Sequence, residues 1–272
     1  MTITRRQAID LLDRHHVRPS RALGQNFVVD PNTVRRIARL AQIEAGDPVV
    51  EVGAGLGSLT VALVEAGADV TAVELDRHLL PVLDEVLTES DPRPRIVHGD
   101  ALKLDWSRLL AGHSRWQLVA NLPYNVATPL VLDVLDGVPA IDRMLVMVQR
   151  EVGERLAAPA STPAYGIPSV KVAYWASAEI VGRVGPNVFL PRPKVESVLV
   201  RIVRRASPAT PADPGRLFSL VRAGFGQRRK MLRRALAGRV GPDDFDRAAI
   251  PPEARAEELS VQQWGRLAGA PE

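Results

Sequence analysis

The sequence predicts an α/β protein with a Rossmann-like, mainly parallel sheet and a small all-helical C-terminal domain. Three observations lead to this prediction. Short apolar segments alternate with helical patterns between residues 48 and 149, an order typical of parallel sheets with right-handed crossovers. The segment PKVESVLVRIV alternates apolar and polar positions, which favours an antiparallel strand at one edge. Beyond the proline-rich stretch PATPADPG, only helical patterns follow.

At 272 residues with 46% hydrophobic content, the chain suits one large domain and a smaller one. We place the boundary in the proline-rich stretch, which gives a Rossmann-like domain with an N-terminal helical extension at 1–207 and a helical domain at 208–272. The chain has no Cys, which excludes disulfides and thiolate catalysis. It also has no apolar run long enough for a signal core or a membrane span, so we expect a cytoplasmic protein.

The expected strands of the parallel sheet are VVEV, VTAVEL, RIVHGD, QLVANL and MLVMVQ. The first expected helices are the amphipathic segment at the N-terminus, a helix opened by Asp30-Pro31, and LTVALVEA after the first strand. In the C-terminal domain we expect LFSLVRAGF, RRKMLRRALAG ending at Gly238, and ELSVQQWGRLA with Ser260 as N-cap.

A glycine turn, GAGLG, follows the first strand and opens a helix, with Gly53, Gly55 and Gly57 at every second position. Glycine lets the backbone approach a ligand closely, and a helix N-terminus adds outward-pointing amides. The spacing differs from the dinucleotide fingerprint G-x-G-x-x-G because Ser58 takes the place of the third glycine. The alternative is a tight strand–helix turn that binds nothing.

Two carboxylates end the next strands: Glu74 ends the second and Asp100 the third. The carboxyl ends of parallel strands share one edge, where open α/β sheets bind ligands. Glu74 can accept both ribose hydroxyls of a nucleoside cofactor, and Asp100 can meet the adenine amine. The sequence therefore predicts a nucleoside-cofactor site. The glycine spacing favours S-adenosyl-L-methionine over NAD, because a sulfonium cofactor has no pyrophosphate to bind.

The fourth strand ends on Asn121, followed by Leu122, Pro123 and Tyr124. A methyl acceptor must be held in line with the donor methyl, so positioning and desolvation matter most. The side-chain oxygen of Asn121 and the main-chain carbonyl of Leu122 can accept the two N–H groups of an exocyclic adenine amine. Pro123 fixes the local φ, and Tyr124 offers a stacking face for a flipped-out base. The alternative is a turn residue, a helix starter and rim packing.

The charge distribution points to a polyanionic partner. The formal net charge is +4, and the stretch from Arg216 to Arg239 contains basic residues but no Asp or Glu. This block predicts a phosphate-facing surface, the alternative being a solvated basic helix. Arg192 and Lys194 are further candidates for nucleic-acid contact, with a strand edge as an equal alternative. The 5 histidines show no ligand spacing, so we expect no metal.

A set of segments, in this order, resembles the ribosomal RNA adenine dimethylases, particularly those of the small ribosomal subunit, from about residue 15 to the C-terminus. These segments are LGQNFVVD, VVEVGAGLG, AVELD, HGDAL, VANLPYNVATPL, MVQREVGERL, YGIPSVKVAYWA, FLPRPKVESVLVRI and FGQRRKMLRRAL. The resemblance implies a methyltransferase that uses S-adenosyl-L-methionine. Its expected products are N6-dimethylated adenosines, two adjacent ones in a hairpin loop near the 3′ end of 16S rRNA, in an immature small ribosomal subunit.

The resemblance also implies roles for individual residues. Cofactor contacts are expected at Asn26, the main chain of Val28, Gly53, Gly55, Glu74, Asp100, Ala101 and Asn121. Contacts to the target adenine are expected at Asn121, Leu122, Pro123, Tyr124 and Phe189, the last being a second aromatic that sandwiches the base. The RNA contacts expected at Arg222, Arg228, Arg229, Lys230, Arg233 and Arg234 follow instead from the basic block described above. Val28 stands where the family usually has Leu, and Ala54 where it often has Pro; neither difference removes a functional group.

Three alternative functions remain open on the sequence. The macrolide-resistance (Erm) methyltransferases use the same chemistry on 23S rRNA, but YGIPSVKVAYWA and FGQRRKMLRRAL favour the small-subunit enzymes. A protein that is mainly a ribosome-assembly binding factor would need the basic surfaces but not Asn121. An NAD-dependent oxidoreductase has the glycine spacing against it. We expect a monomer that does not bind membranes and selects its RNA mainly through the basic C-terminal domain.

Overall fold

The structure is a computed structural model that describes residues 2–269. The chain forms two compact units, each with its own core. Unit 1 comprises Met1–Gly153 and Glu179–Val203, and unit 2 comprises Glu154–Ala178 and Arg204–Glu272. Among the described residues, no helix is both long and apolar enough to cross a membrane.

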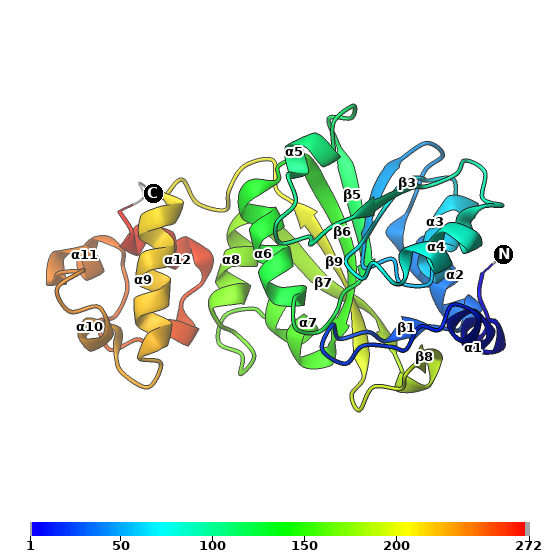
Figure 1. Ribbon diagram of the computed structural model, residues 1–272. Coiled ribbons are helices and arrows are strands. Elements are labelled where there is room, and N and C mark those ends of the chain that lie inside the picture. Colours follow the sequence, from blue (N-terminus) through cyan, green and yellow to red (C-terminus); the bar gives the residue numbers. More distant parts are fainter. Residues whose placement is uncertain (1, 270–272) are drawn as a thin grey trace. The chain divides into compact units, whose positions relative to one another are not determined.

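The central sheet has seven strands in the order β4-β3-β2-β5-β6-β9-β7 (Figure 1). Strands β2 to β6 pair in parallel, and β9 pairs antiparallel with β6. The expected strands and the antiparallel strand near the edge are therefore confirmed. The bounds are β2 (Pro48–Val52), β3 (Asp69–Glu74), β4 (Arg95–His98), β5 (Trp116–Asn121), β6 (Ile141–Gln149), β7 (Ala176–Val184) and β9 (Ser197–Arg204).

Helices cover both faces of the sheet, with α2 and α3 on one face and α6 on the other (Figure 1). The expected start of α2 is confirmed: Asp30 accepts a hydrogen bond from the Thr33 amide at 2.9 Å, and Pro31 is the first helical residue. The bounds are α1 (Arg5–Arg14), α2 (Pro31–Ala41), α3 (Ser58–Glu65), α4 (Leu80–Leu87), α5 (Trp106–Leu109) and α6 (Ala127–Gly137). Helix α7 (Arg150–Leu156) follows β6 directly.

A small two-stranded ribbon was not expected from the sequence. Strand β1 (Phe27–Val28) pairs antiparallel with β8 (Phe189–Leu190), which follows the short 3-10 helix η1 (Pro186–Val188). Helix α1 lies beside it (Figure 1), because Arg5 donates to the carbonyl oxygens of Asn187 and Phe189, both at 2.8 Å. Since Phe27 is opposite Leu190 in the register, the residues that precede β1 and those that follow β8 meet at one end of the ribbon.

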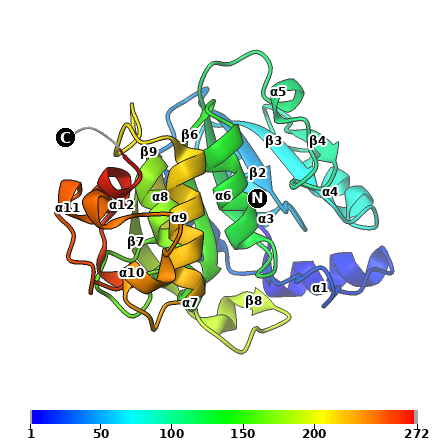
Figure 2. The same ribbon diagram turned by 90° about the vertical axis from the view of Figure 1, so that its left-hand side faces the viewer.

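Unit 2 is helical, and α9 to α12 group around one core (Figure 2). Its elements are α8 (Ile167–Trp175), α9 (Pro214–Gly226), α10 (Leu232–Ala235), α11 (Pro242–Arg247), η2 (Ala256–Glu258) and α12 (Val261–Leu267). The N-cap at Ser260 is confirmed, with a capping box to Gln263. RRKMLRRALAG is not one helix: only α10 is helical, and the Lys230 amide bonds to the Gln227 carbonyl in a turn at 2.8 Å.

The division into units differs from the single boundary expected between residues 207 and 208. The segment Glu154–Ala178 packs with the C-terminal helices instead of the large domain. Tyr165 and Tyr174 are both buried in the core of unit 2, and their hydroxyls donate to the carbonyl oxygens of Leu259 at 2.8 Å and Ala212 at 2.9 Å. These buried aromatic rings anchor the segment Glu154–Ala178 to unit 2. The boundary predicted from the proline-rich stretch gave no indication of this packing.

Candidate active site

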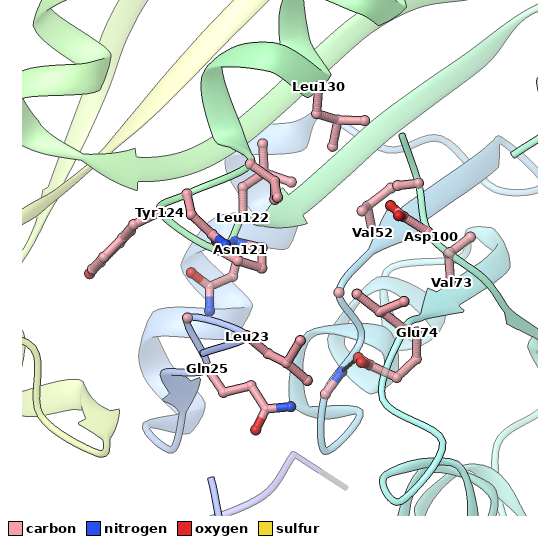
Figure 3. A pocket seen from close by; sticks show the side chains of 18 of the residues that line it. Leu23, Gln25, Val52, Val73, Glu74, Asp100, Asn121, Leu122, Tyr124 and Leu130 are labelled. Atoms are coloured by element: carbon pink, nitrogen blue, oxygen red, sulfur yellow. Dashed lines mark hydrogen bonds between the residues drawn. The ribbon is translucent and has the colours of Figure 1, made fainter. Parts of the chain in front are cut away.

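A cavity lies at the carboxyl ends of β2, β3, β4 and β5 in unit 1. Figure 3 shows Glu74 and Asp100 on one side of it, and Asn121 and Tyr124 on the other. The expected site residues that line the cavity are Asn26, Gly53, Gly55, Glu74, Asp100, Ala101, Asn121, Leu122, Pro123 and Tyr124. The structure therefore brings together the glycine turn, the two strand-end acids and the Asn-Leu-Pro-Tyr segment.

Glu74 is held rigidly in the wall of the cavity. Its carboxylate accepts hydrogen bonds from the amides of Gly55 and Asp76, both at 2.8 Å. Burial raises the pKa of Glu74, and the hydrogen bonds from Asp76 and Gly55 oppose that rise. Two amide donors fix the plane of the carboxylate, and its remaining lone pairs are the acceptors available to a ligand with neighbouring hydroxyl groups.

Asp100 stands at the same end of the sheet, beyond β4. Its Oδ1 accepts from the Leu102 amide at 3.1 Å, and Lys103 Nζ lies 3.6 Å from Oδ2. The cavity lining among the described residues holds these two acids and no Arg, Lys or His. An acid-lined cavity suits a cationic ligand and disfavours a pyrophosphate. Separately, residues 2–269 contain no cluster of three acidic or His side chains that could hold a metal.

The backbone of the glycine turn favours glycine, and at Gly55 it leaves no room for a side chain. Gly53, Gly55 and Gly57 all have positive φ, which favours glycine. A Cβ at Gly55 would lie 2.9 Å from the Phe27 ring. Apolar side chains of Val52, Val73 and Leu130 line the space nearby (Figure 3). Apolar walls, paired acceptors and a glycine backbone together fit a nucleoside that carries a positive charge, such as S-adenosyl-L-methionine.

Asn121 lies on the same side of the cavity as Tyr124, opposite the two acids (Figure 3). Its Nδ2 donates to the Asn26 carbonyl at 2.9 Å, so the amide is oriented by a residue from the N-terminal segment. This leaves Oδ1 as the atom of Asn121 that can accept a hydrogen bond from a ligand. The next residue, Leu122, is anchored by its amide, which donates to the Met147 carbonyl at 3.1 Å.

Tyr124 is half-buried at the rim of the cavity. Its hydroxyl lies 3.2 Å from the Oγ atom of Ser197, a fully buried residue on β9. Burial raises the pKa of Tyr124 and the Ser197 hydrogen bond opposes that rise, so the side chain stays a neutral phenol at pH 7. The hydroxyl contact fixes the direction of the ring, which is the property that a stacking platform for a base requires.

Phe189 does not have the exposed position expected of a second stacking aromatic. The ring is 0% exposed, within the core cluster that includes Ile37 and Leu199, and it does not line the cavity. The pairing of Phe189 with Val28 in the β1–β8 ribbon turns the side chain into the core. Val28 is also outside the main cavity; it borders a small hollow behind the glycine turn together with Glu51.

Two residues of the site were not singled out from the sequence. Gln25 lines the cavity, where its Nε2 donates to Asp76 at 2.9 Å and its Oε1 accepts from the Ser20 amide at 2.7 Å. Glu51 lies in the middle of β2 and accepts from Thr60 Oγ1 at 2.6 Å. Burial, with a contribution from Glu74, raises the pKa of Glu51 to about 8, so this side chain is mostly protonated at pH 7. The sequence did offer a signal for Glu51, because it is an ionisable residue inside the otherwise apolar strand VVEV.

The basic residues expected to bind RNA lie in unit 2 and fall into two groups. Arg228 pairs with Glu257 at 2.5 Å, and Arg233 pairs with Glu253 at 2.9 Å. The other four are exposed and have no side-chain partner within the described part of the chain: Arg222, Arg229, Lys230 and Arg234. The two acids, which come from after residue 250, therefore neutralise part of a block that looks uniformly basic in sequence.

Comparisons with known proteins agree on one family. Residues 17–270 match the ribosomal RNA adenine dimethylase family. The ribosomal RNA small subunit methyltransferase A of Streptomyces coelicolor is 48% identical over 93% of this chain and 91% of its own length. Its namesake from Kineococcus radiotolerans is 47% identical over 98% of this chain and 90% of its own length.

Solved structures share the fold. The 23S rRNA methyltransferase ErmE has a TM-score of 0.70 and 26% identity over 90% of this chain and 98% of its own. A dimethyladenosine transferase from Plasmodium falciparum has a TM-score of 0.75 and 22% identity over 88% of this chain and 94% of its own. Because the family match spans nearly the whole chain, this protein belongs to the ribosomal RNA adenine dimethylase family.

Proposed function

We propose that this protein transfers methyl groups from S-adenosyl-L-methionine to N6 of two adjacent adenosines in a hairpin loop near the 3′ end of 16S rRNA. The observation that carries the proposal is the position of Asn121. Its amide is oriented by Asn26, and it lines the cavity beside Tyr124 and opposite the two acids. This arrangement joins a site for a cationic cofactor to a site for a planar, neutral acceptor. The relatives named above supply the substrate class.

In this proposal, each residue of the cavity binds or orients. The cofactor, when bound, supplies an electrophilic methyl group. Glu74 accepts hydrogen bonds from its ribose hydroxyls, and Asp100 accepts one from its adenine amine. Oδ1 of Asn121 and the carbonyl of Leu122 accept the two N–H groups of the target amine and turn its lone pair toward the methyl group. Tyr124 stacks on the target base.

The proposed chemistry requires no strong base on the protein. The amine nitrogen of adenine is a weak nucleophile because its lone pair is delocalised into the ring. Once the nitrogen is methylated it carries a positive charge, so its proton is readily lost. The contribution of Asn121 and Leu122 is therefore to orient the amine and stabilise the positive charge as it develops, which preorganised acceptors do efficiently in a site that excludes water.

The proposed setting is an immature small ribosomal subunit in the cytoplasm, where the protein acts as a monomer. The relatives' name supports the small subunit, and the four exposed cations Arg222, Arg229, Lys230 and Arg234 support a phosphate-facing surface there. Replacing Arg222, Arg229, Lys230 and Arg234 together by Gln should weaken binding to small particles and lower its salt dependence. The matched control replaces the ion-paired Arg228 and Arg233, and it should change the salt dependence less per charge removed.

The decisive experiment follows labelled methyl transfer to small and to large ribosomal particles that lack the modification. We expect transfer to small particles, and mass analysis of the released adenosine should show two methyls. Asn121→Ala should lower the rate at least about 100-fold while particle binding persists. The control is Asn32→Ala, an exposed Asn on α2, which should leave the rate unchanged.

Three other outcomes would contradict the proposal. Transfer to large particles instead would favour the substrate named for ErmE. Full binding without any transfer would favour an assembly factor. Full transfer by Asn121→Ala would remove Asn121 from the mechanism.

A further inference from the structure

A second hollow in unit 1, which we call the groove, adjoins the cavity on the side of Tyr124. One wall comes from the turn before β1, and the other from the segment after β8. The groove and the cavity share five lining residues: Gly24, Gln25, Asn26, Tyr124 and Asn125. A polymer that places one base beside Tyr124 must therefore pass its chain along the groove.

Backbone pairing and close packing hold the walls of the groove in place. The β1–β8 pairing brings the two wall segments together, because Phe27 is opposite Leu190. The first wall is a turn in which the Gly24 amide bonds to the Arg21 carbonyl at 3.1 Å. Gly24 packs so closely that an added Cβ would lie 3.1 Å from Oδ1 of Asn125. In the second wall, Pro191 and Pro193 flank Arg192 and limit the backbone freedom of that segment.

The charged residues that line the groove are all cationic: Arg21, Arg192 and Lys194. All three are exposed, and none has a side-chain partner among residues 2–269. By contrast, Arg14 earlier in the same segment contacts Glu85 at 2.8 Å. Glu196, two residues after Lys194, already pairs with Arg150 at 3.2 Å. Three unpaired cations that converge on one hollow fit a ligand with several negative charges.

We propose that the groove binds the phosphates on either side of the target adenosine, with Arg21 on one wall and Arg192 and Lys194 on the other. The proposal rests on the function proposed above, because it takes the ligand to be an RNA strand whose base enters the cavity. The guanidinium group of Arg192 is planar and suits a bidentate contact to a phosphate, whereas the ammonium group of Lys194 acts as a point charge. The groove thus holds the strand while Tyr124 holds the base.

The test uses the full-length protein with S-adenosylhomocysteine bound and a fluorescent RNA hairpin whose loop carries two adjacent adenosines. Fluorescence anisotropy measures the affinity at a series of salt concentrations for the wild type and for the triple variant Arg21→Gln, Arg192→Gln, Lys194→Gln. Each phosphate contact to a single strand contributes roughly 0.7 to the salt slope, so the variant should lower the slope by about 2 and the affinity on the order of 50-fold at 0.15 M salt.

A matched control removes three positive charges elsewhere in unit 1, with Arg6, Arg39 and Arg108, all exposed and outside the groove, replaced by Gln. Equal losses in the control and the groove variant would overturn the proposal, because the effect would then come from net charge. An unchanged salt slope in the groove variant would overturn it as well. Binding of S-adenosylhomocysteine and the melting temperature should match the wild type in both triple variants, which establishes that they are folded.

A second measurement locates the contacts on the RNA. Neutral methylphosphonate linkages on both sides of the target adenosine should weaken binding to the wild type, but should have little further effect on the groove variant. Additive losses would mean that the groove does not contact these phosphates and would overturn the proposal. The binding assays do not depend on catalysis, so failure of the wild type to methylate any particle would contradict the proposed function while leaving the groove result readable.

Discussion

The cavity and the groove share five residues, yet their charges are opposite. The cavity is lined by the acidic residues Glu74 and Asp100, whereas the groove is lined by the basic residues Arg21, Arg192 and Lys194. The cofactor that we propose carries a net positive charge, and the RNA that carries the acceptor adenosine is negatively charged because of its phosphates. Each hollow therefore attracts one ligand and repels the other. Asn121 lies in the cavity, where the reacting atoms of the two ligands would meet. The two adjoining hollows therefore separate the two substrates by charge.

The largest expected effect is on the cavity side. Glu74→Ala removes both acceptors proposed for the ribose hydroxyls, and hydrogen bonds to a charged group contribute about 1.5 to 3 kcal/mol each. We expect the affinity for S-adenosylhomocysteine to fall at least about 100-fold by calorimetry. Binding of the RNA hairpin without cofactor should not change. Glu74→Gln keeps the shape and one acceptor, so it should lose less; an RNA defect of equal size in either variant would contradict the division of labour between the two hollows.

The next effect concerns Tyr124, which borders both hollows. Tyr124→Ala removes the proposed stacking face, and stacking contributes about 1 to 3 kcal/mol per base. We expect kcat/KM for methyl transfer to fall about 30-fold, with unchanged affinity for S-adenosylhomocysteine. Tyr124→Phe keeps the ring and loses only the contact with Ser197 at 3.2 Å, so its loss should be severalfold smaller. If Phe and Ala were equally impaired, the hydroxyl and not the ring would be the functional group.

Gly55→Ala tests whether the cavity and the groove both depend on the packing of the glycine turn against Phe27. The new Cβ would lie 2.9 Å from the ring of Phe27, and Phe27 belongs to the ribbon that carries the groove walls. Gly46→Ala is the matched control, because Gly46 also has positive φ but nothing within 4 Å of the added Cβ. We expect Gly55→Ala to be the less stable variant by about 1.5 kcal/mol in chemical denaturation. It should weaken binding of both ligands, whereas Gly46→Ala should weaken neither.

The smallest expected effect is the pH dependence of stability from Glu51. Its pKa is about 8 in the folded protein because of burial, against 4.5 ordinarily. The folded state therefore holds a proton that the unfolded state releases, and this contribution to stability is complete below about pH 4.5 and is lost as pH rises to about 8. Between pH 6 and 7 the free energy of unfolding should fall by about 1.3 kcal/mol on account of Glu51.

Glu51→Gln should flatten this part of the curve, since Gln does not titrate and can still accept from Thr60. Urea denaturation of both proteins at pH 6 and pH 7 measures the difference. Parallel pH dependence in the two proteins would mean that Glu51 is ionised in the folded state. A further negative charge would then lie behind the glycine turn, where it interacts with Glu74 at neutral pH.

Much of the cavity could be predicted because its residues follow strands of strong apolar character. Once VVEV, VTAVEL, RIVHGD and QLVANL are taken as parallel strands, the acids and Asn121 must meet at one edge. Phe189 shows where this reasoning stops. Strand β8 has only two residues, too few to show a period, so which face its aromatic ring takes depends on its pairing with β1. That pairing is a long-range contact without a local signal.

The same limit applies to the C-terminal half of the chain. Ser260 could be assigned as an N-cap from local chemistry alone, and the structure confirms it. The membership of Tyr165 and Tyr174 in the core of unit 2 depends on hydrogen bonds to Leu259 and Ala212, which lie far along the chain. Likewise, Glu253 and Glu257 neutralise Arg233 and Arg228 only because the chain folds back. Local patterns predict elements better than partners.

The β1–β8 ribbon also has a consequence for the order in which the protein becomes active during synthesis. β1 is made early, but its partner leaves the ribosome only after all the parallel strands have done so. The glycine turn and both strand-end acids thus precede β8 in the chain, whereas the residues before β1 gain their neighbours only once β8 is made. A chain that stops short of β8 lacks Arg192 and Lys194 of the groove, and it also lacks β9, the antiparallel neighbour of β6. The groove beside Tyr124 therefore requires residues that are synthesised after all the parallel strands.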